Sequence, residues 1–467
     1  MANQYRVEED LIGKKEVPAS AYYGIQSVRA DENFNITGYT IDSELIVAIA
    51  YVKKAAAMAN MEIGSLEDTI GQAIVKAADE IIAGKLHDEF IVDPIQGGAG
   101  TSTNMNANEV IANRALELLG KEKGDYDVIH PNSHVNMAQS TNDAFPTAIH
   151  IATYRLAKRL ETTMQKLVTT FEKKSDEFDH VIKMGRTHLQ DAVPIRLGQE
   201  FNAYGRVLSR DLKRLQQSLK GILEVNLGAT AVGTGLNADP EYMKRSVEIL
   251  SELTDIPFVN AADLVDATQN TDAYTDISAS LKICMVNMSK VANDLRLMAS
   301  GPRTGFAELH LPARQPGSSI MPGKVNPVIC EVVNQVAFQV AGNDLTVSLA
   351  SEAGQFELNV MEPVLIYNLH QSLHIMNQVL EVFGEYCIEG IEANIDTCKN
   401  YVDKSLGIIT ALNPHIGYEA ATKIAKEALE TSASIRELIL RDNILTEEEL
   451  DNILEPFEMT KPGIAGK

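Results

Sequence analysis

Hydrophobic residues recur along most of this chain at gaps of three and four positions, which places their side chains on one face of an α-helix. The longest series lies between residues 144 and 178, and two others lie within residues 281–298 and 365–383. Because the gaps alternate around the heptad value, we predict several long helices that run almost parallel in a bundle. The members of the three series are Leu156, Leu160, Met164, Leu167, Phe171 and Phe178; Leu281, Met285, Met288, Val291, Leu295 and Met298; and Leu365, Leu369, Leu373, Met376, Leu380 and Phe383.

Residues 314–327, "RQPGSSIMPGKVNP", interrupt this helical pattern. Three prolines and two glycines exclude an ordinary helix, and the helical spacing of valines resumes afterwards in residues 333–340. Long irregular segments in compact proteins are often lids or binding loops, although a plain connection between helices is the simpler alternative. Lys324 and Asn326 offer a cation and an amide, a pair that suits a carboxylate ligand.

A second polar stretch, "GGAGTSTNMNANEV" at residues 97–110, joins glycines to consecutive hydroxyl side chains. Backbone N–H groups and the Thr101 hydroxyl in such a loop form an anion site where a helix begins. An ordinary N-terminal cap is the simpler alternative.

A third stretch, "NMAQSTNDAFPTAIH" at residues 136–150, crowds Ser140, Thr141 and Asn142 before the longest predicted helix. Capping and the helix dipole are enough to explain Asp143 at that place. Three neighbouring polar side chains exceed what one cap needs, so we keep them as candidates for ligand binding.

The fourth stretch, "GRTHLQDAVP" at residues 185–194, places Thr187 beside His188 between two helical runs. The histidines within the predicted helices have structural explanations. His188 is therefore the histidine that we expect to contact a substrate, with a purely structural role as the alternative.

The chain divides into three segments by pattern. Shorter helices with Gly- and Asn-rich connections occupy the first part, the long helices follow, and a small helical unit ends the chain, which predicts domains at residues 1–142, 143–395 and 396–467. Residues 363–380 carry no formal charge but several polar side chains, which predicts a helix buried on most sides rather than a membrane span. A helix of this kind favours a homo-oligomer whose bundles merge.

Composition and charge argue against several classes of partner and site. The chain has 467 residues and a net charge of −23, which argues against a nucleic-acid partner or an anionic membrane. Its first residues have no apolar core that would suit a secretory signal. The four cysteines, Cys284, Cys330, Cys387 and Cys398, show no metal-ligand spacing, so we expect free thiols in a reducing cytoplasm and no metal site.

Taken together and in this order, "GGAGTSTNMNANEV", "QSTNDAFPT", "GRTHLQDAVP" and "GSSIMPGKVNP" resemble the aspartase/fumarase superfamily, whose signature is the last of them. The similarity extends from "AYYGIQSVRADENF" to the closing "KPGIAGK". Within the superfamily, "GGAGTS" and "QSTNDA" resemble the ammonia-lyases, because fumarases of this type typically read "GSGTQSNMN" and "QSSND" at those places. The other two stretches are shared by both enzymes.

This resemblance implies a mainly α, three-domain lyase whose central bundles merge into a 20-helix-type core in a cytoplasmic homotetramer, with active sites shared by three subunits. It implies reversible anti elimination of ammonia from L-aspartate to give fumarate through an aci-carboxylate intermediate. The alternatives are a class II-type fumarase (fumarate hydratase) or another fumarate-releasing lyase, and, from a different class, a non-catalytic binding protein on the same scaffold. No cofactor is expected for the chemistry, and activation by Mg²⁺ is left open.

The resemblance also assigns roles to the candidate residues, with small-molecule substrates as the only ligands. The β-carboxylate would contact Thr101, Ser140, Thr141 and Ser319; the α-carboxylate would contact Lys324, Asn326 and Thr187; the amino group would contact Asn142, Thr101 and His188. The implied general base is Ser318.

A serine hydroxyl is a poor base unless its alkoxide is strongly stabilised. The backbone of Gly317 and Gly323, the following helix start and the Lys324 cation are the available sources of that stabilisation. His188 is the competing base, since an imidazole has a pKa near neutrality. Residue types alone leave the choice open, while the resemblance favours Ser318 with His188 as a binding group.

Overall fold

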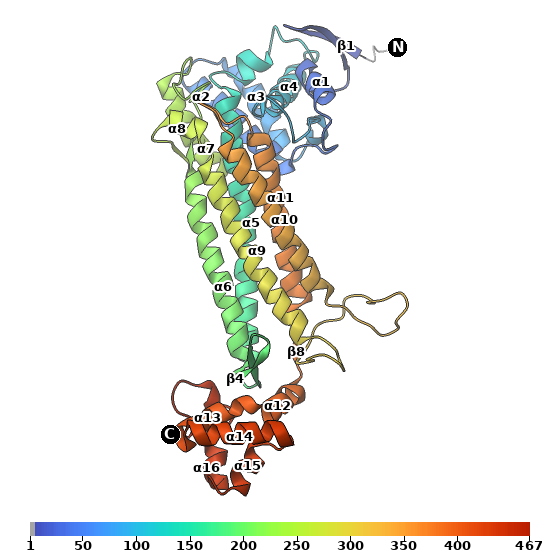
Figure 1. The fold of residues 1–467 in the computed structure, drawn as a ribbon. Helices are drawn as coiled ribbons and strands as arrows, with labels where there is room; N and C mark the ends of the chain where they lie inside the picture. The colour runs from blue at the N-terminus through green and yellow to red at the C-terminus, as the bar shows by residue number, and fades with distance from the viewer. Residues whose placement is uncertain (1–4) are drawn as a thin grey trace. The chain divides into compact units, whose positions relative to one another are not determined.

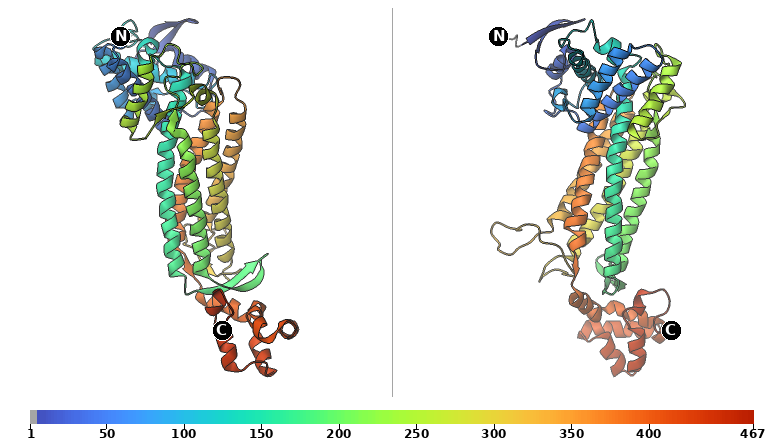
Figure 2. Two further views of the ribbon diagram at one scale, coloured as in Figure 1. Left: turned by 90° about the vertical axis from the view of Figure 1, so that its left-hand side faces the viewer. Right: turned by 180° about the vertical axis from the view of Figure 1, so that it is seen from behind.

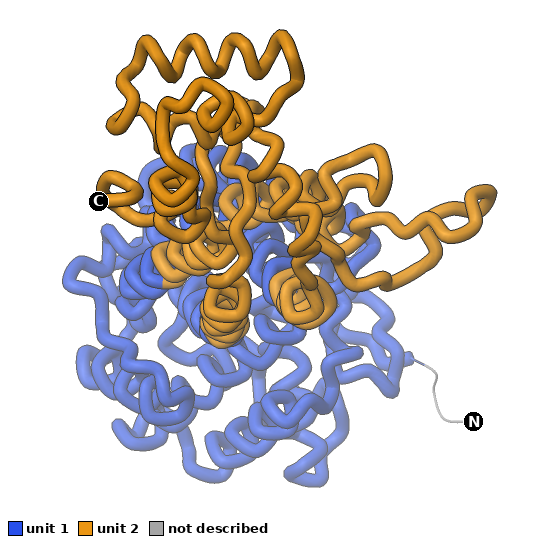
Figure 3. Tube along the Cα trace, turned by 90° about the horizontal axis from the view of Figure 1, so that it is seen from below, with its two compact units in different colours: residues 1–161, 213–283, 338–377 blue, residues 162–212, 284–337, 378–467 orange. Residues whose placement is uncertain are grey.

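The computed structural model describes residues 5–467, and helices dominate it (Figure 1). Contacts divide the chain into two compact units, coloured separately in Figure 3. Unit 1 holds the chain up to residue 161 together with residues 213–283 and 338–377. Unit 2 holds residues 162–212, 284–337 and 378–467.

Five long helices each begin in one unit and end in the other. They are α5 (Thr141–Glu177), α6 (Leu197–Ser218), α9 (Asp272–Met298), α10 (Val328–Glu352) and α11 (Glu362–Tyr386). Within each unit the segments of these helices pack side by side, as the views of Figures 1 and 2 agree. The predicted bundle of long helices is therefore confirmed.

The hydrophobic series that predicted these helices are buried throughout. One detail differs on α10, where Val333 and Val340 are buried but Val336 is only half buried. Ala337 takes the buried position beside it. Residues 363–380 form most of α11, and Gln378 is the one exposed residue among them, so the predicted burial of this uncharged helix is confirmed.

Unit 1 adds a group of shorter helices and two small sheets to its part of the bundle. These elements are β1 (Tyr5–Asp10), β2 (Gly13–Pro18), α1 (Ile25–Asn33), α2 (Ser43–Glu62), α3 (Asp68–Ile82), α4 (Thr101–Leu118), β5 (Glu224–Val225), α7 (Pro240–Thr254), β6 (Val259–Asn260) and α8 (Leu264–Gln269). The alanine-rich α2 lies at their centre and packs against α3, α4 and α7. Asp42 caps α2 by accepting the Glu44 N–H at 2.7 Å.

Polar contacts join the bundle helices within unit 1. Ser278 of α9 donates to Asp344 of α10 at 2.9 Å, and Thr153 of α5 lies 3.1 Å from the buried His370 of α11. Each of these polar groups finds a partner inside the bundle, as buried polar groups require.

Unit 2 joins its part of the bundle to a C-terminal set of small helices. Its other elements are β3 (Ile182–Thr187), β4 (Gln190–Arg196), β7 (Leu309–His310), β8 (Glu392–Ala393), α12 (Ile395–Lys404), α13 (Ile409–Ile416), α14 (Tyr418–Thr431), α15 (Ile435–Arg441) and α16 (Glu447–Ile453). Phe171, Phe201, Tyr204 and Phe383 form an aromatic cluster between its long helices. The small helices have an apolar core of their own, which Met184 of β3 joins.

Two further expectations can be compared with the structure. Among residues 5–467, the four cysteines form no disulfide. No helix in this range combines the length and the hydropathy that a membrane span needs. The division into three domains at residues 142 and 395 stays a prediction.

Candidate active site

The glycine-rich stretch at residues 97–110 opens α4 as predicted. Gly98, Ala99 and Gly100 take consecutive positive φ values of 96°, 55° and 86° and turn the chain into the helix. A Cβ at Gly100 would lie 2.4 Å from the Phe145 ring, so only glycine fits there. Thr101, the first residue of α4, is exposed and donates its hydroxyl to the Gly98 carbonyl at 2.7 Å. An exposed hydroxyl thus stands at the positive end of a helix.

The stretch at residues 136–150 contains the start of α5, where side-chain hydrogen bonds hold the turn. The Ser140 N–H donates to Asp143 at 2.9 Å, and the Asn142 N–H donates to the Ser140 hydroxyl at 3.2 Å. Asp143 is fully buried and also accepts the N–H groups of Gly228 and Thr230. Burial raises the pKa of Asp143 to about 6 against the opposing effect of these donors. The capping role predicted for Asp143 is confirmed.

A side-chain hydrogen bond joins these two stretches. The Asn104 amide of α4 donates to the Thr141 hydroxyl of α5 at 3.0 Å. The Asn142 amide donates to the Ala231 carbonyl at 2.7 Å. Unit 1 thereby brings the starts of α4 and α5 together, with Thr101, Ser140, Thr141 and Asn142 at or beside them.

A buried lysine supports this arrangement, and the sequence analysis missed it. Lys53 of α2 is 0% exposed and donates to Asn104, Asn136 and Gln139 at 2.6, 2.8 and 2.8 Å. The signal was available, because Lys53 lies among alanines on the buried face of α2, and an isolated lysine in such a place needs dedicated partners.

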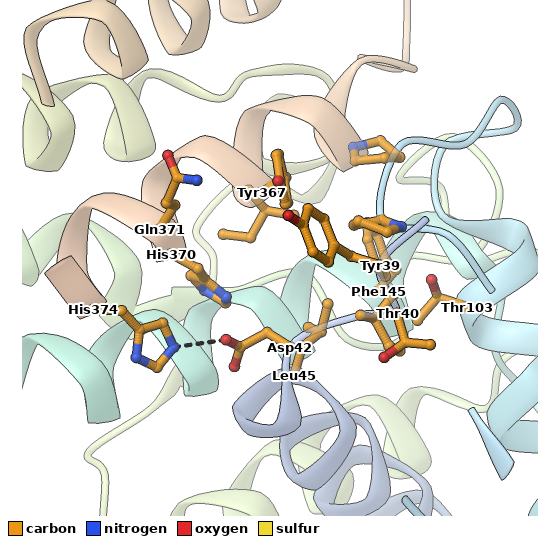
Figure 4. A pocket seen from close by; sticks show the side chains of 14 residues that line it. Tyr39, Thr40, Asp42, Leu45, Thr103, Phe145, Tyr367, His370, Gln371 and His374 are labelled. Atoms are coloured by element: carbon orange, nitrogen blue, oxygen red, sulfur yellow. Dashed lines mark hydrogen bonds and ion pairs between the residues drawn. The ribbon is translucent and has the colours of Figure 1, made fainter. Parts of the chain in front are cut away.

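A cavity of about 380 Å³ in unit 1 adjoins the same helix starts. Its lining includes Thr103 of α4 and Phe145 of α5, and also Asp42, Tyr367 and His374 (Figure 4). The Asp42 carboxylate lies 2.6 Å from His374 Nε2. None of the ten predicted site residues lines this cavity.

The stretch at residues 185–194 is a β-hairpin, which the sequence analysis did not predict. Strands β3 and β4 pair antiparallel, and His188 and Leu189 form the two-residue turn with φ values of 55° and 60°. This turn type normally carries glycine or asparagine, so two ordinary side chains there are strained. Thr187 and His188 are both exposed at the tip.

The loop at residues 314–327 contains no regular helix or strand and extends away from the helices of unit 2 (Figure 2). Its neck is closed by the Gly317 N–H, which donates to the Lys324 carbonyl, and by the Asn326 amide, which donates to the Gly317 carbonyl, both at 2.7 Å. Ser319 and Lys324 are exposed, and α10 begins directly after Pro327. The predicted break in the helical pattern is confirmed.

Ser318 occupies a particular position within this loop. Its hydroxyl oxygen accepts the backbone N–H groups of Ile320 and Met321 at 3.2 and 3.1 Å. Two donors directed at one oxygen stabilise negative charge on that oxygen. A serine that acts as a base requires this stabilisation of its alkoxide.

The ten candidates therefore fall into two groups. Unit 1 contains Thr101, Ser140, Thr141 and Asn142, and unit 2 contains Thr187, His188, Ser318, Ser319, Lys324 and Asn326. Each unit holds one part of the predicted site.

Comparison with known proteins defines the family. The family described as Lyase matches residues 13–342, and the one described as Fumarase C C-terminus matches residues 408–461. The solved structure of a fumarate lyase:delta crystallin from Brucella melitensis bound to cobalt has a TM-score of 0.96 and 47% identity, covering 98% of this chain and 100% of that one. A class II fumarase from Schistosoma mansoni has a TM-score of 0.94 and 36% identity, with 98% and 99% covered. The chain belongs to this lyase family, the aspartase/fumarase superfamily that its motifs predicted.

Sequence relatives place the chain more narrowly. Aspartate ammonia-lyase of Bacillus subtilis (strain 168) is 67% identical over 464 residues, covering 99% of this chain and 98% of that protein. Aspartate ammonia-lyase of a Bacillus species is 64% identical over 467 residues and covers 100% of both. The predicted likeness to the ammonia-lyases is confirmed. These relatives favour the ammonia-lyase interpretation over the fumarase alternative.

Proposed function

We propose that this protein is an enzyme that eliminates ammonia from L-aspartate reversibly and yields fumarate. The observation that carries the proposal is the identity of 67% and 64% to aspartate ammonia-lyases over almost the whole chain. The fold alone does not choose the substrate, because a class II fumarase superposes with a TM-score of 0.94.

The chemistry requires removal of a proton from the carbon beside the β-carboxylate. The resulting aci-carboxylate carries an additional negative charge, so groups that stabilise this charge lower the barrier most. The C–N bond then breaks, ammonia leaves, and the carbon–carbon double bond of fumarate forms. Fixing both carboxylates holds the proton and the amino group anti to each other.

In this proposal the starts of α4 and α5 bind the β-carboxylate. Thr101, Ser140 and Thr141 supply neutral hydroxyl donors there, and two helix N-termini add positive potential. Ser319 of the loop completes the set. The Asn142 amide nitrogen is used on Ala231, so its side-chain oxygen is the atom that would accept from the amino group.

The loop and the hairpin supply the remaining groups. Ser318 acts as the general base, since the N–H groups of Ile320 and Met321 would stabilise its alkoxide. Lys324, Asn326 and Thr187 bind the α-carboxylate, and His188 contacts the amino group. One hydrogen of the Asn326 amide is used at the loop neck, which leaves the other for the ligand.

The reaction is tested by following fumarate absorbance after adding L-aspartate or L-malate separately. We expect fumarate from L-aspartate only. Fumarate from L-malate without turnover of L-aspartate would establish the fumarase alternative, and no turnover of either would support a non-catalytic protein.

We further propose a homotetramer with active sites shared by three subunits. An exposed apolar stripe on α10 supports association, since Phe338, Leu345 and Leu349 are 70%, 62% and 61% exposed at helical spacing. Sedimentation equilibrium tests this directly: we expect a tetramer, and Leu345→Glu should shift the population toward smaller species.

Sharing of active sites can be tested by complementation. Thr141→Val and Ser318→Ala each inactivate one part of the proposed site, in unit 1 and unit 2. If different subunits supply these residues, co-expressed variants form hybrid tetramers in which some sites are intact, and activity returns. Inactive hybrids would show that one subunit supplies both residues.

Two remaining expectations complete the proposal. The elimination should need no cofactor, so activity should survive dialysis against a chelator, and subsequent titration with Mg²⁺ would reveal an activating effect. We also propose a cytoplasmic location, which fractionation of the native host with an antibody would test.

A further inference from the structure

The ammonium group of Lys53 is enclosed by three side-chain amides in unit 1. Its Nζ donates to the amide oxygens of Asn104, Asn136 and Gln139, which come from the two polar stretches that open α4 and α5. An ammonium has three hydrogens and no acceptor, so these contacts use its full hydrogen-bonding capacity. One buried cation therefore ties the two stretches together.

We propose that Lys53 and Asn104 are positioning residues that present the Thr141 hydroxyl as a hydrogen-bond donor to the substrate carboxylate. This inference rests on the proposed function, in which Thr141 binds the β-carboxylate. Neither residue needs to touch the substrate.

The direction of each hydrogen bond follows from Lys53. Because Lys53 only donates, the Asn104 oxygen must face it, and the Asn104 amide hydrogens must face the other way. One hydrogen goes to Thr141 Oγ1 at 3.0 Å and the other to Asn136 Oδ1 at 3.2 Å. The orientation of the Asn104 amide is thereby fixed.

The consequence falls on Thr141. Its oxygen accepts from Asn104, and among residues 5–467 its hydroxyl makes no donated hydrogen bond. Thr141 is not completely enclosed, since 8% of the residue is exposed at the start of α5. A hydroxyl whose acceptor role is already filled is prepared to donate to a carboxylate.

Burial of Lys53 disfavours its charged form, and nearby polar and charged groups oppose this effect. Burial lowers the pKa of Lys53 to about 7, and the negative charge of Asp143 acts in the opposite direction. Three amide oxygens around Nζ also stabilise the ammonium. The protonated lysine matches all of its contacts.

Asn104→Asp is the decisive variant. An aspartate of the same shape still accepts from Lys53, but it has no hydrogen for Thr141, so the Thr141 hydroxyl would turn and donate to it. We expect a loss of about 10- to 100-fold in kcat/KM for L-aspartate and in the affinity for succinate, with folding preserved. Wild-type values for both would overturn the inference, whereas a wild-type enzyme without L-aspartate turnover would instead overturn the proposed function.

A double-mutant cycle separates this mechanism from simple charge repulsion. In a Thr141→Val background the hydroxyl is absent, so Asn104→Asp should cost little further succinate affinity. An equal cost in both backgrounds would mean that the new carboxylate repels the ligand directly, and the proposed role would fail.

Lys53→Met tests whether the Lys53 ammonium fixes the orientation of the Asn104 amide. Lys54→Met is its matched control. Lys54 is the neighbouring lysine and pairs with Asp79 at 2.6 Å toward solvent. We expect Lys53→Met to weaken succinate binding at least as much as Asn104→Asp, and Lys54→Met to bind succinate like the wild type. Equal succinate affinities in the two methionine variants would contradict the inference. If Lys53→Met does not fold, Asn104→Asp decides alone.

Discussion

The two parts of the proposed site are built in different ways. In unit 1, the starts of α4 and α5 are fixed by buried groups such as Lys53 and Asp143, whose partners come from several elements. In unit 2, the hairpin tip and the loop are exposed and hold their shape through contacts within their own turns. The proposed binding groups of unit 1 are therefore preorganised by packing, whereas those of unit 2 depend on local backbone geometry and have little burial to hold them.

The largest expected effect concerns Ser318, in the exposed part. Ser318→Ala removes the proposed base, so kcat should fall by about 10²- to 10⁴-fold. Thermal melting should be unchanged, because the hydroxyl contacts only its own turn. Stopped-time assays of fumarate formation and calorimetry check the two expectations.

His188→Gln is the control for that base assignment. A binding role predicts a weaker loss than in Ser318→Ala. If Ser318→Ala kept near-normal turnover while His188→Gln lost it, the histidine would be the base.

Lys324→Met should have the next largest effect. Losing one charge-assisted contact to the α-carboxylate costs about 1.5–3 kcal/mol, which corresponds to roughly 10- to 100-fold in kcat/KM. Most of this should appear in KM, because the contact is made to substrate and transition state alike. Unchanged kinetic constants would remove Lys324 from the binding set.

Outside the proposed site, unit 1 should respond to pH through the pair of Asp42 and His374. Burial raises the pKa of Asp42, but the hydrogen bond from His374 and its charge outweigh this and lower it to about 2. The same hydrogen bond raises the pKa of His374 above its usual 6.5. The stabilisation from His374 is thus complete below about pH 6.5 and is lost as pH rises through the raised pKa, while that from Asp42 is lost as pH falls from about 4 toward 2.

His374→Gln tests this pH window. Because His374 is partly exposed, the variant should lose no more than about 1 kcal/mol at pH 5.5, and less at pH 9. Urea unfolding at both pH values measures the difference. The same loss at both values would show that the pair contributes no pH dependence.

The smallest effect is expected at the hairpin tip. Leu189 holds a φ of 60° that glycine adopts without strain, so Leu189→Gly should gain a few tenths of a kcal/mol after the entropic cost of glycine. Comparison of melting curves detects this gain. A loss of stability would mean that the exposed leucine makes contacts that offset its strain.

Much of the fold was predictable because the periodicity of a helix can be read from a short segment of sequence, without knowledge of its partners. The long series from Leu156 to Phe178 and from Leu365 to Phe383 identified α5 and α11, and prolines located the break before α10. The β-hairpin was not predictable, because His188 and Leu189 are residues that such turns rarely carry.

Site residues could be predicted where the interacting groups lie close together in the sequence, and not where they lie far apart. Thr101 and Thr141 were visible because hydroxyl groups cluster locally before each helix. The contribution of Lys53 was not visible in the sequence, because its partners lie 51 to 86 residues away. Only the folded chain brings them to one ammonium group. Isolated charges on apolar helix faces are the sequence signal worth searching for.

The closed neck of the loop has a consequence for engineering. Two hydrogen bonds join Gly317 to Lys324 and Asn326, so residues 317–326 start and finish at one point and form a self-contained cassette. A cassette of this kind can be transplanted between homologous scaffolds with little disturbance at its junctions. Exchange of this segment with that of a fumarase should therefore exchange the loop that carries the proposed base and leave the substrate preference with the recipient's α4 and α5 starts. If the proposed roles hold, selectivity and proton removal can then be redesigned separately.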